Sequence, residues 1–306
     1  MQQKKVILLA GPTASGKSKL AVHIAQHIDG EIINGDSMQI YKEISILTSR
    51  PDTKETSIIK HHLYGFHSVK KKFSTGLWLK MTIKKIKEQW NKNKTPIIVG
   101  GTGLYFKALT DGLVEIPDIP NKLRVEIRKL HKDAGQKIFF KKLMKIDPFV
   151  ENFISSSDSQ RSIRAYEVKK YTNKSLFTFI KNTKANFNTD VFRKIFINTP
   201  KEILSKKIDQ RVENMFAQGV TQEVKKFLNI KIDKQLSSNK IIGIQEIRDY
   251  LAKKITLSET KELIKLKTRQ YAKRQFTWSR GHMKSWGMIY SPNFKDLLKK
   301  TIDKIF

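Results

Sequence analysis

Short apolar runs alternate with helix-like spacings along the chain. Residues Val6–Ala10 and 96–99 are apolar runs of strand length, and 31–33 and 191–197 give further strand signals that include charged residues. Residues 77–90 instead carry Leu, Met and Ile at the spacing of one helix face. Alternation of strands and helices predicts an α/β fold with a parallel, doubly wound sheet, whose ligands bind at the carboxyl ends of the strands.

The pattern changes in the middle of the chain. Pro117 and Pro120 interrupt it, and the following segment shows helical spacing with polar faces and no buried strand. We therefore expect an all-helical insertion at 114–189 in a core made of 1–113 and 190–306, with a mostly helical C-terminal region after residue 200.

A phosphate-binding loop follows the first apolar run. Its context is a strand, a glycine-bounded loop and a helix, which disfavours a chance match. Gly11 and Gly16 allow the backbone to wrap an oxyanion, Lys17 reaches the terminal phosphate, and Ser18 can hold Mg²⁺. The predicted diphosphate- or nucleotide-binding residues are Gly11, Pro12, Thr13, Ala14, Ser15, Gly16, Lys17 and Ser18. ATP is the default ligand of such a loop, but the loop alone does not identify the polyphosphate.

Composition narrows the class of protein. The 306 residues contain no cysteine, which excludes disulfides and thiolate metal sites. The net charge of +32 favours a nucleic-acid partner, although it is spread along a lysine-rich chain and so is weaker than a patch. No apolar run reaches the roughly 18 residues of a membrane span, and no signal-peptide pattern is seen at the start of the sequence. We expect a cytoplasmic protein without a membrane partner, and nothing requires more than a monomer.

Two further loops follow predicted strands. Asp36, after 31–33, can bind Mg²⁺, act as a general base or cap a helix beginning near Met38. The strand at 96–99 is followed by Gly100–Gly103 and not by the acidic residue that a hydrolytic P-loop enzyme uses to hold Mg²⁺. The small residues around Thr102 either let a ligand approach the backbone closely or only form a tight turn. Both loops should meet the phosphate loop in one crevice.

Two basic segments are candidates for RNA contact. In 158–167, Asp158 or Ser159 caps a helix that places Gln160, Arg161 and Arg164 near one face. These side chains suit contacts with phosphates and base edges, or they belong to a solvated face that pairs with Glu167. The run 268–278 mixes basic and aromatic residues, as RNA-binding surfaces do, but its aromatic residues fit a helix core equally well. A third short basic run, Lys70-Lys71-Lys72, has no assigned role.

Together these segments resemble the tRNA dimethylallyltransferase (tRNA isopentenyltransferase) family over most of the chain. The matching stretches are GPTASGKS at 11–18, GDSMQIY at 35–41, GGTGLY at 100–105, DSQRSIRAYEV at 158–168, RVENMFAQG at 211–219 and TRQYAKRQFTW at 268–278. The sequence departs from the family pattern at Leu47–Pro51, at Tyr64-Gly65 and at Ile244-Gln245. These departures concern local tRNA contacts.

The resemblance implies transfer of a dimethylallyl group from dimethylallyl diphosphate to N6 of adenosine 37 in tRNA, with Mg²⁺ as cofactor and N6-dimethylallyladenosine and diphosphate as products. It implies that Asp36 is the general base, that Thr102 lies at the reacting centre, and that Arg211 and the phosphate loop hold the donor, with Ser18 on Mg²⁺. The tRNA-binding residues that it implies are Asp36, Ser37, Met38, Gln39, Thr102, Arg124, Gln160, Arg161, Ser162, Ile163, Arg164, Lys273, Arg274 and Gln275.

Three other functions fit parts of the sequence. A P-loop kinase would bind ATP and transfer a phosphoryl group. A basic P-loop protein could bind RNA without catalysis. A prenyltransferase for free adenine nucleotides would need neither the segment 158–167 nor the basic C-terminal region, so both argue against it.

Overall fold

The structure is a computed structural model that describes residues 4–233 and 236–306. One compact unit comprises residues 1–110 and 187–306, and a second comprises 111–186. Each boundary lies three residues from the one expected from the sequence. We refer to these parts as the core unit and the insertion unit.

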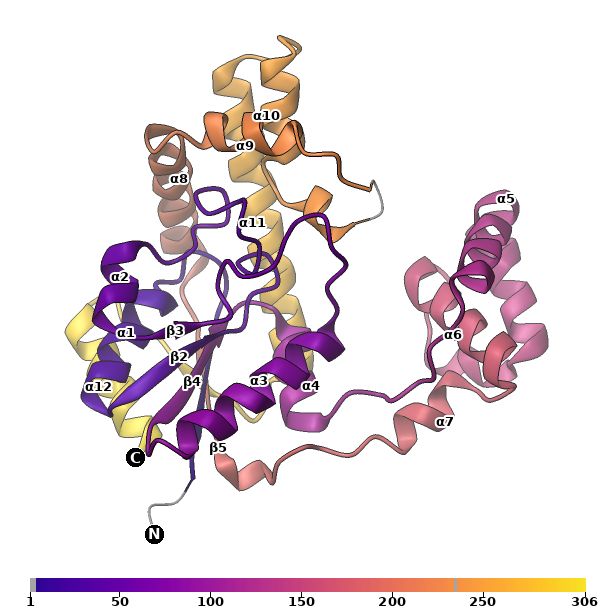
Figure 1. Cartoon of the computed structure of the whole chain (residues 1–306), viewed down its shortest axis with the longest axis horizontal. Coiled ribbons are helices and arrows are strands. Elements are labelled where there is room, and N and C mark those ends of the chain that lie inside the picture. Colours follow the sequence, from indigo (N-terminus) through magenta and orange to yellow (C-terminus); the bar gives the residue numbers. More distant parts are fainter. Residues whose placement is uncertain (1–3, 234–235) are drawn as a thin grey trace. The chain divides into compact units, whose positions relative to one another are not determined.

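The core unit contains a six-stranded sheet in which every pairing is parallel, which confirms the predicted fold class (Figure 1). The strand order is β3-β2-β4-β1-β5-β6. The strands are β1 (Val6–Ala10), β2 (Gly30–Asn34), β3 (His61–His62), β4 (Thr95–Gly100), β5 (Phe192–Ile197) and β6 (Gly287–Ile289). The four strand signals of the sequence thus form the four inner strands, whereas β3 and β6 are short edge strands that the sequence did not indicate.

Helices follow the strands as a doubly wound fold requires. The helices of the core unit are α1 (Lys17–His27), α2 (Thr53–Ile58), α3 (Thr75–Trp90), α4 (Gly103–Asp111), which ends at the first residue of the insertion unit, α8 (Lys201–Ala217), α9 (Val220–Leu228), α10 (Ile244–Leu251), α11 (Leu257–His282) and α12 (Phe294–Ile305). Short 3₁₀ helices occupy η2 (Thr189–Val191) and η3 (Ser237–Lys240). The C-terminal region is therefore mostly helical, as predicted.

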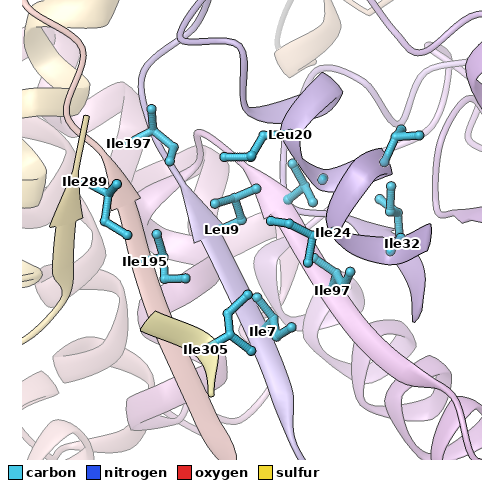
Figure 2. Close-up of a cluster of buried hydrophobic side chains, with 14 of the residues drawn as sticks. Ile7, Leu9, Leu20, Ile24, Ile32, Ile97, Ile195, Ile197, Ile289 and Ile305 are labelled. Carbon is cyan, nitrogen blue, oxygen red and sulfur yellow. The ribbon is translucent and has the colours of Figure 1, made fainter. Parts of the chain in front are cut away.

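The core lies on both faces of the sheet. On one face, α1 and α12 cover branched side chains of the central strands, including Ile7, Leu9, Ile97 and Ile195 (Figure 2). These side chains are fully shielded from solvent, so each contributes about 1.5–3 kcal/mol of hydrophobic free energy relative to its exposed state. This packing fixes the strand ends from which the loops of the site emerge.

The insertion unit is all-helical, as expected. Its helices are α5 (Asn121–Ile146), η1 (Pro148–Asn152), α6 (Ser159–Thr172) and α7 (Leu176–Lys181). Gly135 adopts φ 70° and ψ 162° inside α5, so two helical segments meet at a kink there. Phe139 and Leu143 of α5 pack with Ala165 and Tyr166 of α6 to form a separate small core.

Candidate active site

The phosphate loop lies between β1 and α1. Gly16 has φ +86°, a conformation that glycine adopts without strain, and it begins α1 with no side-chain cap on the helix N-terminus. The backbone N–H groups of the first turn therefore remain available to an anion. Lys17 Nζ donates to Pro12 O at 3.1 Å. Burial lowers the pKa of Lys17 to about 8, with Asp36 opposing the shift and Arg211 adding to it.

Arg211, on α8, reaches the phosphate loop from a distant part of the chain. Its Nη1 donates to Thr13 Oγ1 at 2.8 Å and its Nη2 donates to Thr48 O at 3.2 Å. Burial lowers the pKa of Arg211, and the charge of Asp36 opposes this. Arg211 Nε and Ser15 Oγ are buried without a hydrogen-bond partner in the structure. Unpaired buried polar atoms beside a free helix N-terminus fit a bound anion that would satisfy them.

The side chain of Asn34 holds the backbone of Asp36 at the end of β2. The amide of Asp36 donates to Asn34 Oδ1 at 2.7 Å, and Asn34 Nδ2 donates back to Asp36 O. Asp36 Oδ1 accepts the amide of Met38 at 2.9 Å. Of the alternatives for Asp36, the cap of a helix near Met38 is wrong, because residues 37–50 form turns and no helix. One carboxylate oxygen thus stabilises a turn.

Thr102 lies beside Asp36, as the strand order required. Its Oγ1 accepts the amide of Ser37 at 2.9 Å and donates to Ser37 Oγ at 3.3 Å. Burial raises the pKa of the Tyr271 phenol, the charge of Asp36 raises it further, and a hydrogen bond to the Thr102 side chain opposes both. Tyr271 therefore stays protonated near the carboxylate. The structure brings the phosphate loop, Asp36 and Arg211 together in one cleft, whereas Thr102 lines a separate cavity of about 220 Å³ with Tyr271, Arg274 and Gln275.

Gln275, on α11, connects the two glycine-rich loops. Its Oε1 accepts the amide of Thr13 at 2.9 Å, and its Nε2 donates to Gly101 O at 2.9 Å. Its side chain is buried. The sequence placed Gln275 in a basic, aromatic run and did not indicate this role, because the two loops lie 174 and 262 residues away.

The loop after Asp36 has a second remote anchor. Glu223 on α9 accepts the amides of Ser45, Ile46 and Leu47 at 2.6, 2.8 and 2.9 Å, and the hydroxyl of Ser45 at 2.9 Å. Gln39 Nε2 then donates to the carbonyls of residues 48 and 49. No local sequence signal identifies Glu223, since its partners are 176–178 residues distant.

Two cavities of the core unit meet at Asp36 and Arg211. A cleft of about 790 Å³ is lined by the phosphate loop and by the acidic and basic side chains around it, and a smaller cavity of about 200 Å³ has mostly apolar walls. The residues that line both cavities are Thr13, Asp36, Arg211 and Met215. A charged donor group and an uncharged acceptor can therefore approach the same carboxylate from two sides.

The residues present fit a Mg²⁺ ion held mainly by a substrate. Ser18 and Asp36 line the same cleft. Among residues 4–233 and 236–306, no group of three or more His, Cys, Asp or Glu side chains could hold a metal ion by itself. Mg²⁺ is commonly bound through one or two protein oxygens together with phosphate oxygens, which matches this donor set.

The expected RNA-contacting residues differ in exposure. In the core unit, Lys273 and Arg274 are exposed, whereas Met38 packs partly against the apolar cluster around Ile40. In the insertion unit, Asp158 caps α6 as predicted, and Gln160 and Arg161 are exposed.

Other residues of α6 face inward or are paired. Ser162 is buried and donates to Asp158 O. Arg164 pairs with the buried Glu167 at 3.3 Å, the alternative that the sequence left open. Ile163 packs partly against the small core, and Arg124 Nε on α5 is buried without a partner.

The model of the IPP transferase family matches residues 39–282. The chain belongs to this family. It is 55% identical to tRNA dimethylallyltransferase of Pelagibacter ubique over 98% of this chain and 96% of that protein, and 42% identical to the enzyme of Rickettsia bellii over the same shares. The family resemblance drawn from the sequence is confirmed.

Solved structures agree with the fold. The tRNA isopentenylpyrophosphate transferase of Bacillus halodurans superposes with a TM-score of 0.70 at 29% identity, covering 99% of this chain and 97% of that one. A eukaryotic dimethylallyltransferase acting on tRNA superposes with a TM-score of 0.78 at 29% identity, covering 90% and 70%. Within the described residues, no helix is both long and apolar enough to span a membrane.

Proposed function

We propose that this protein transfers a dimethylallyl group from dimethylallyl diphosphate to N6 of adenosine 37 in tRNA, next to the anticodon. The observation that carries the proposal is the meeting of an anion-binding loop and a carboxylate at the boundary of two cavities. A diphosphate fits the cleft that Lys17 and Arg211 line, and a base fits the smaller cavity beside Asp36. Membership of the IPP transferase family supports the same chemistry.

Each side chain then has a defined role. The bond between C1 of the dimethylallyl group and the diphosphate oxygen breaks while N6 forms a new bond to C1, and the diphosphate leaves with the electron pair. Lys17, Arg211 and the free N–H groups of α1 stabilise its developing charge. Asp36 accepts the proton that N6 loses. Thr102 accepts a hydrogen bond from the amide of Ser37 and so keeps the adenine and the Asp36 carboxylate aligned.

Mg²⁺ belongs to the proposal as a cofactor. When bound, it neutralises negative charge on the diphosphate, and Ser18 would hold it. We also assign tRNA contacts to the exposed groups of the expected set, namely Gln160, Arg161, Lys273 and Arg274, and to Arg124 of the insertion unit. One chain carries all groups of the core site, so the protein would act as a monomer, in the cytoplasm where its tRNA substrate is found.

One assay tests the reaction. The protein is incubated with Mg²⁺, dimethylallyl diphosphate and unmodified tRNA that carries A36-A37-A38, and the digested nucleosides are analysed by mass spectrometry. We expect N6-dimethylallyladenosine, and none with a tRNA that carries G37 or after chelation of Mg²⁺. ATP turnover without prenylated nucleoside would contradict the proposal and support a P-loop kinase.

A variant tests the role of Asp36. Asp36→Asn keeps an oxygen that can accept the amide of Met38, so the turn should persist while the base is lost. We expect product formation to fall by about 10²–10⁴-fold, the range of general-base catalysis, with tRNA affinity unchanged. Retained turnover would exclude Asp36 as the base.

A further inference from the structure

The run Lys70-Lys71-Lys72 lies on an exposed turn that the proposed reaction does not use. We define residues 66–73 as the lysine turn. All three lysines are exposed, and none of them forms an ion pair with a carboxylate among the described residues. Their charge is therefore available to a partner.

The backbone of this turn is firmly anchored. Glu43 accepts the hydroxyl of Ser68 at 2.8 Å and the amide of Val69 at 3.0 Å, and Val69 is completely buried. The carbonyl of Val69 accepts the hydroxyl of Ser238 at 2.9 Å. A turn fixed in this way presents its lysines at defined positions, so little backbone order is lost when a partner binds.

Aromatic rings accompany the lysines. Phe66, His67 and Phe73 form a cluster with ring centroids 4.8–5.9 Å apart, and Phe66 is 38% exposed. Ammonium groups and an exposed ring on the same turn match the chemistry of RNA, which offers phosphates and unstacked bases together.

The turn is joined directly to the candidate active site. His67 exchanges backbone hydrogen bonds with Ile40 and Lys42 at 2.9 Å, and the amide of Gly65 donates to Gln39 O at 2.9 Å. Gln39 and Asp36 line the same cleft, so the lysine turn is tied by backbone hydrogen bonds to a segment that continues from the wall of the candidate site. An RNA that places a base beside Asp36 would therefore bring neighbouring phosphates to the lysine turn.

From these observations we infer that the lysine turn is a phosphate-binding surface for the tRNA substrate, separate from the contacts assigned above. The inference rests on the proposed function, because it takes tRNA as the partner. Lys70, Lys71 and Lys72 bind the sugar–phosphate backbone near the modified base, and Phe66 provides the adjoining apolar surface. Such contacts position the RNA and carry no sequence information.

The test replaces the three lysines together by alanine. The matched control replaces Lys87, Lys92 and Lys299 by alanine. These lysines are also exposed, but Lys87 lies on α3, Lys92 just after it, and Lys299 on α12. The affinity of each variant for unmodified tRNA is measured between 50 and 200 mM salt. For the lysine-turn variant we expect tRNA binding about 10- to 100-fold weaker and a salt slope smaller by about 2 to 3, because each lost phosphate contact removes close to one unit.

Three comparisons decide the outcome. The KM for dimethylallyl diphosphate should stay unchanged in both variants, and a Lys70→Arg/Lys71→Arg/Lys72→Arg variant should bind tRNA like the parent protein. An unchanged salt slope, or equal losses in the control variant, would overturn the inference while leaving the reaction intact. Parent protein that binds tRNA but forms no prenylated adenosine would refute the proposed function without affecting the binding comparison.

Discussion

Gln275 gives the sharpest test of how the site is held together. The resemblance to the family assigns it to tRNA, whereas the structure buries it between Thr13 and Gly101. Thr13 in turn accepts a hydrogen bond from Arg211, so Gln275 orients the donor side of the site through one intermediate. We predict that Gln275→Ala impairs donor binding and leaves tRNA binding unchanged.

The magnitude follows from the hydrogen bonds that are lost. The substitution removes two bonds of 2.9 Å and leaves the amide of Thr13 and the carbonyl of Gly101 without their partner. Each unsatisfied group costs about 1–3 kcal/mol where water does not replace the bond. Both partners are only partly buried, so we expect about 2 kcal/mol in total. If half of this appears in donor binding, the KM for dimethylallyl diphosphate rises about fivefold.

The assay compares Gln275→Ala with Lys273→Ala, which removes an exposed, proposed tRNA contact of the same helix and should weaken tRNA binding without changing the donor KM. Initial rates at varied donor concentration give KM, and a fluorescence titration gives the tRNA affinity. Gln275→Glu adds a graded case, since it retains an acceptor for Thr13 N and loses the donor to Gly101 O. Weakened tRNA binding with an unchanged donor KM in Gln275→Ala would refute the reasoning and restore the RNA-contact assignment.

Three further predictions concern charge, anchoring and packing. The diphosphate binds the protonated form of Lys17, whose pKa is about 8, so donor affinity should be constant below pH 8 and fall by up to tenfold per unit above it; constant affinity up to pH 10 would contradict this. Glu223→Ala removes four hydrogen bonds to one carboxylate and should lower the free energy of unfolding by about 3 kcal/mol in a urea titration, and a change below about 1 kcal/mol would show that the loop does not depend on it. In Gly103→Ala the new Cβ overlaps Trp278, which should cost about 1–3 kcal/mol by the same titration, whereas Gly281→Ala meets no atom within 4 Å; equal stability of the two variants would exclude the clash.

The inner strands could be predicted from the sequence because β1 and β4 are continuous apolar runs and β2 and β5 contain shorter ones. Strands of this kind are buried on both faces by helices, so their local composition identifies them. The edge strand β3 contains only His61 and His62, and β6 contains only Gly287–Ile289. Their strand geometry comes from pairing with β2 and β5, which no local pattern reports.

The site was partly predictable for a related reason. The phosphate loop, Asp36 and Thr102 follow predicted strands, and the topology of a parallel sheet brings strand ends together. The conformation of residues 37–50 could not be predicted, because Glu223 fixes this loop from a remote helix. The bridging role of Gln275 could not be predicted either, because its partners Thr13 and Gly101 are also remote in the sequence.

The electrostatics of the site explain why it suits a diphosphate that must leave. Burial lowers the pKa of both Lys17 and Arg211, and Asp36 is the acidic residue whose charge opposes both shifts. The cleft is lined by five cationic side chains and three carboxylates, namely Lys17, Lys19, Arg50, Lys207 and Arg211 with Asp36, Asp52 and Glu55. It therefore has excess positive charge, which the anion of the donor neutralises. In the proposed reaction, the opposing negative charge disappears when Asp36 takes the proton from N6, while the diphosphate gains charge. The site is then most strongly positive at the moment when the leaving group is most negative, which favours bond cleavage over return of the prenyl group.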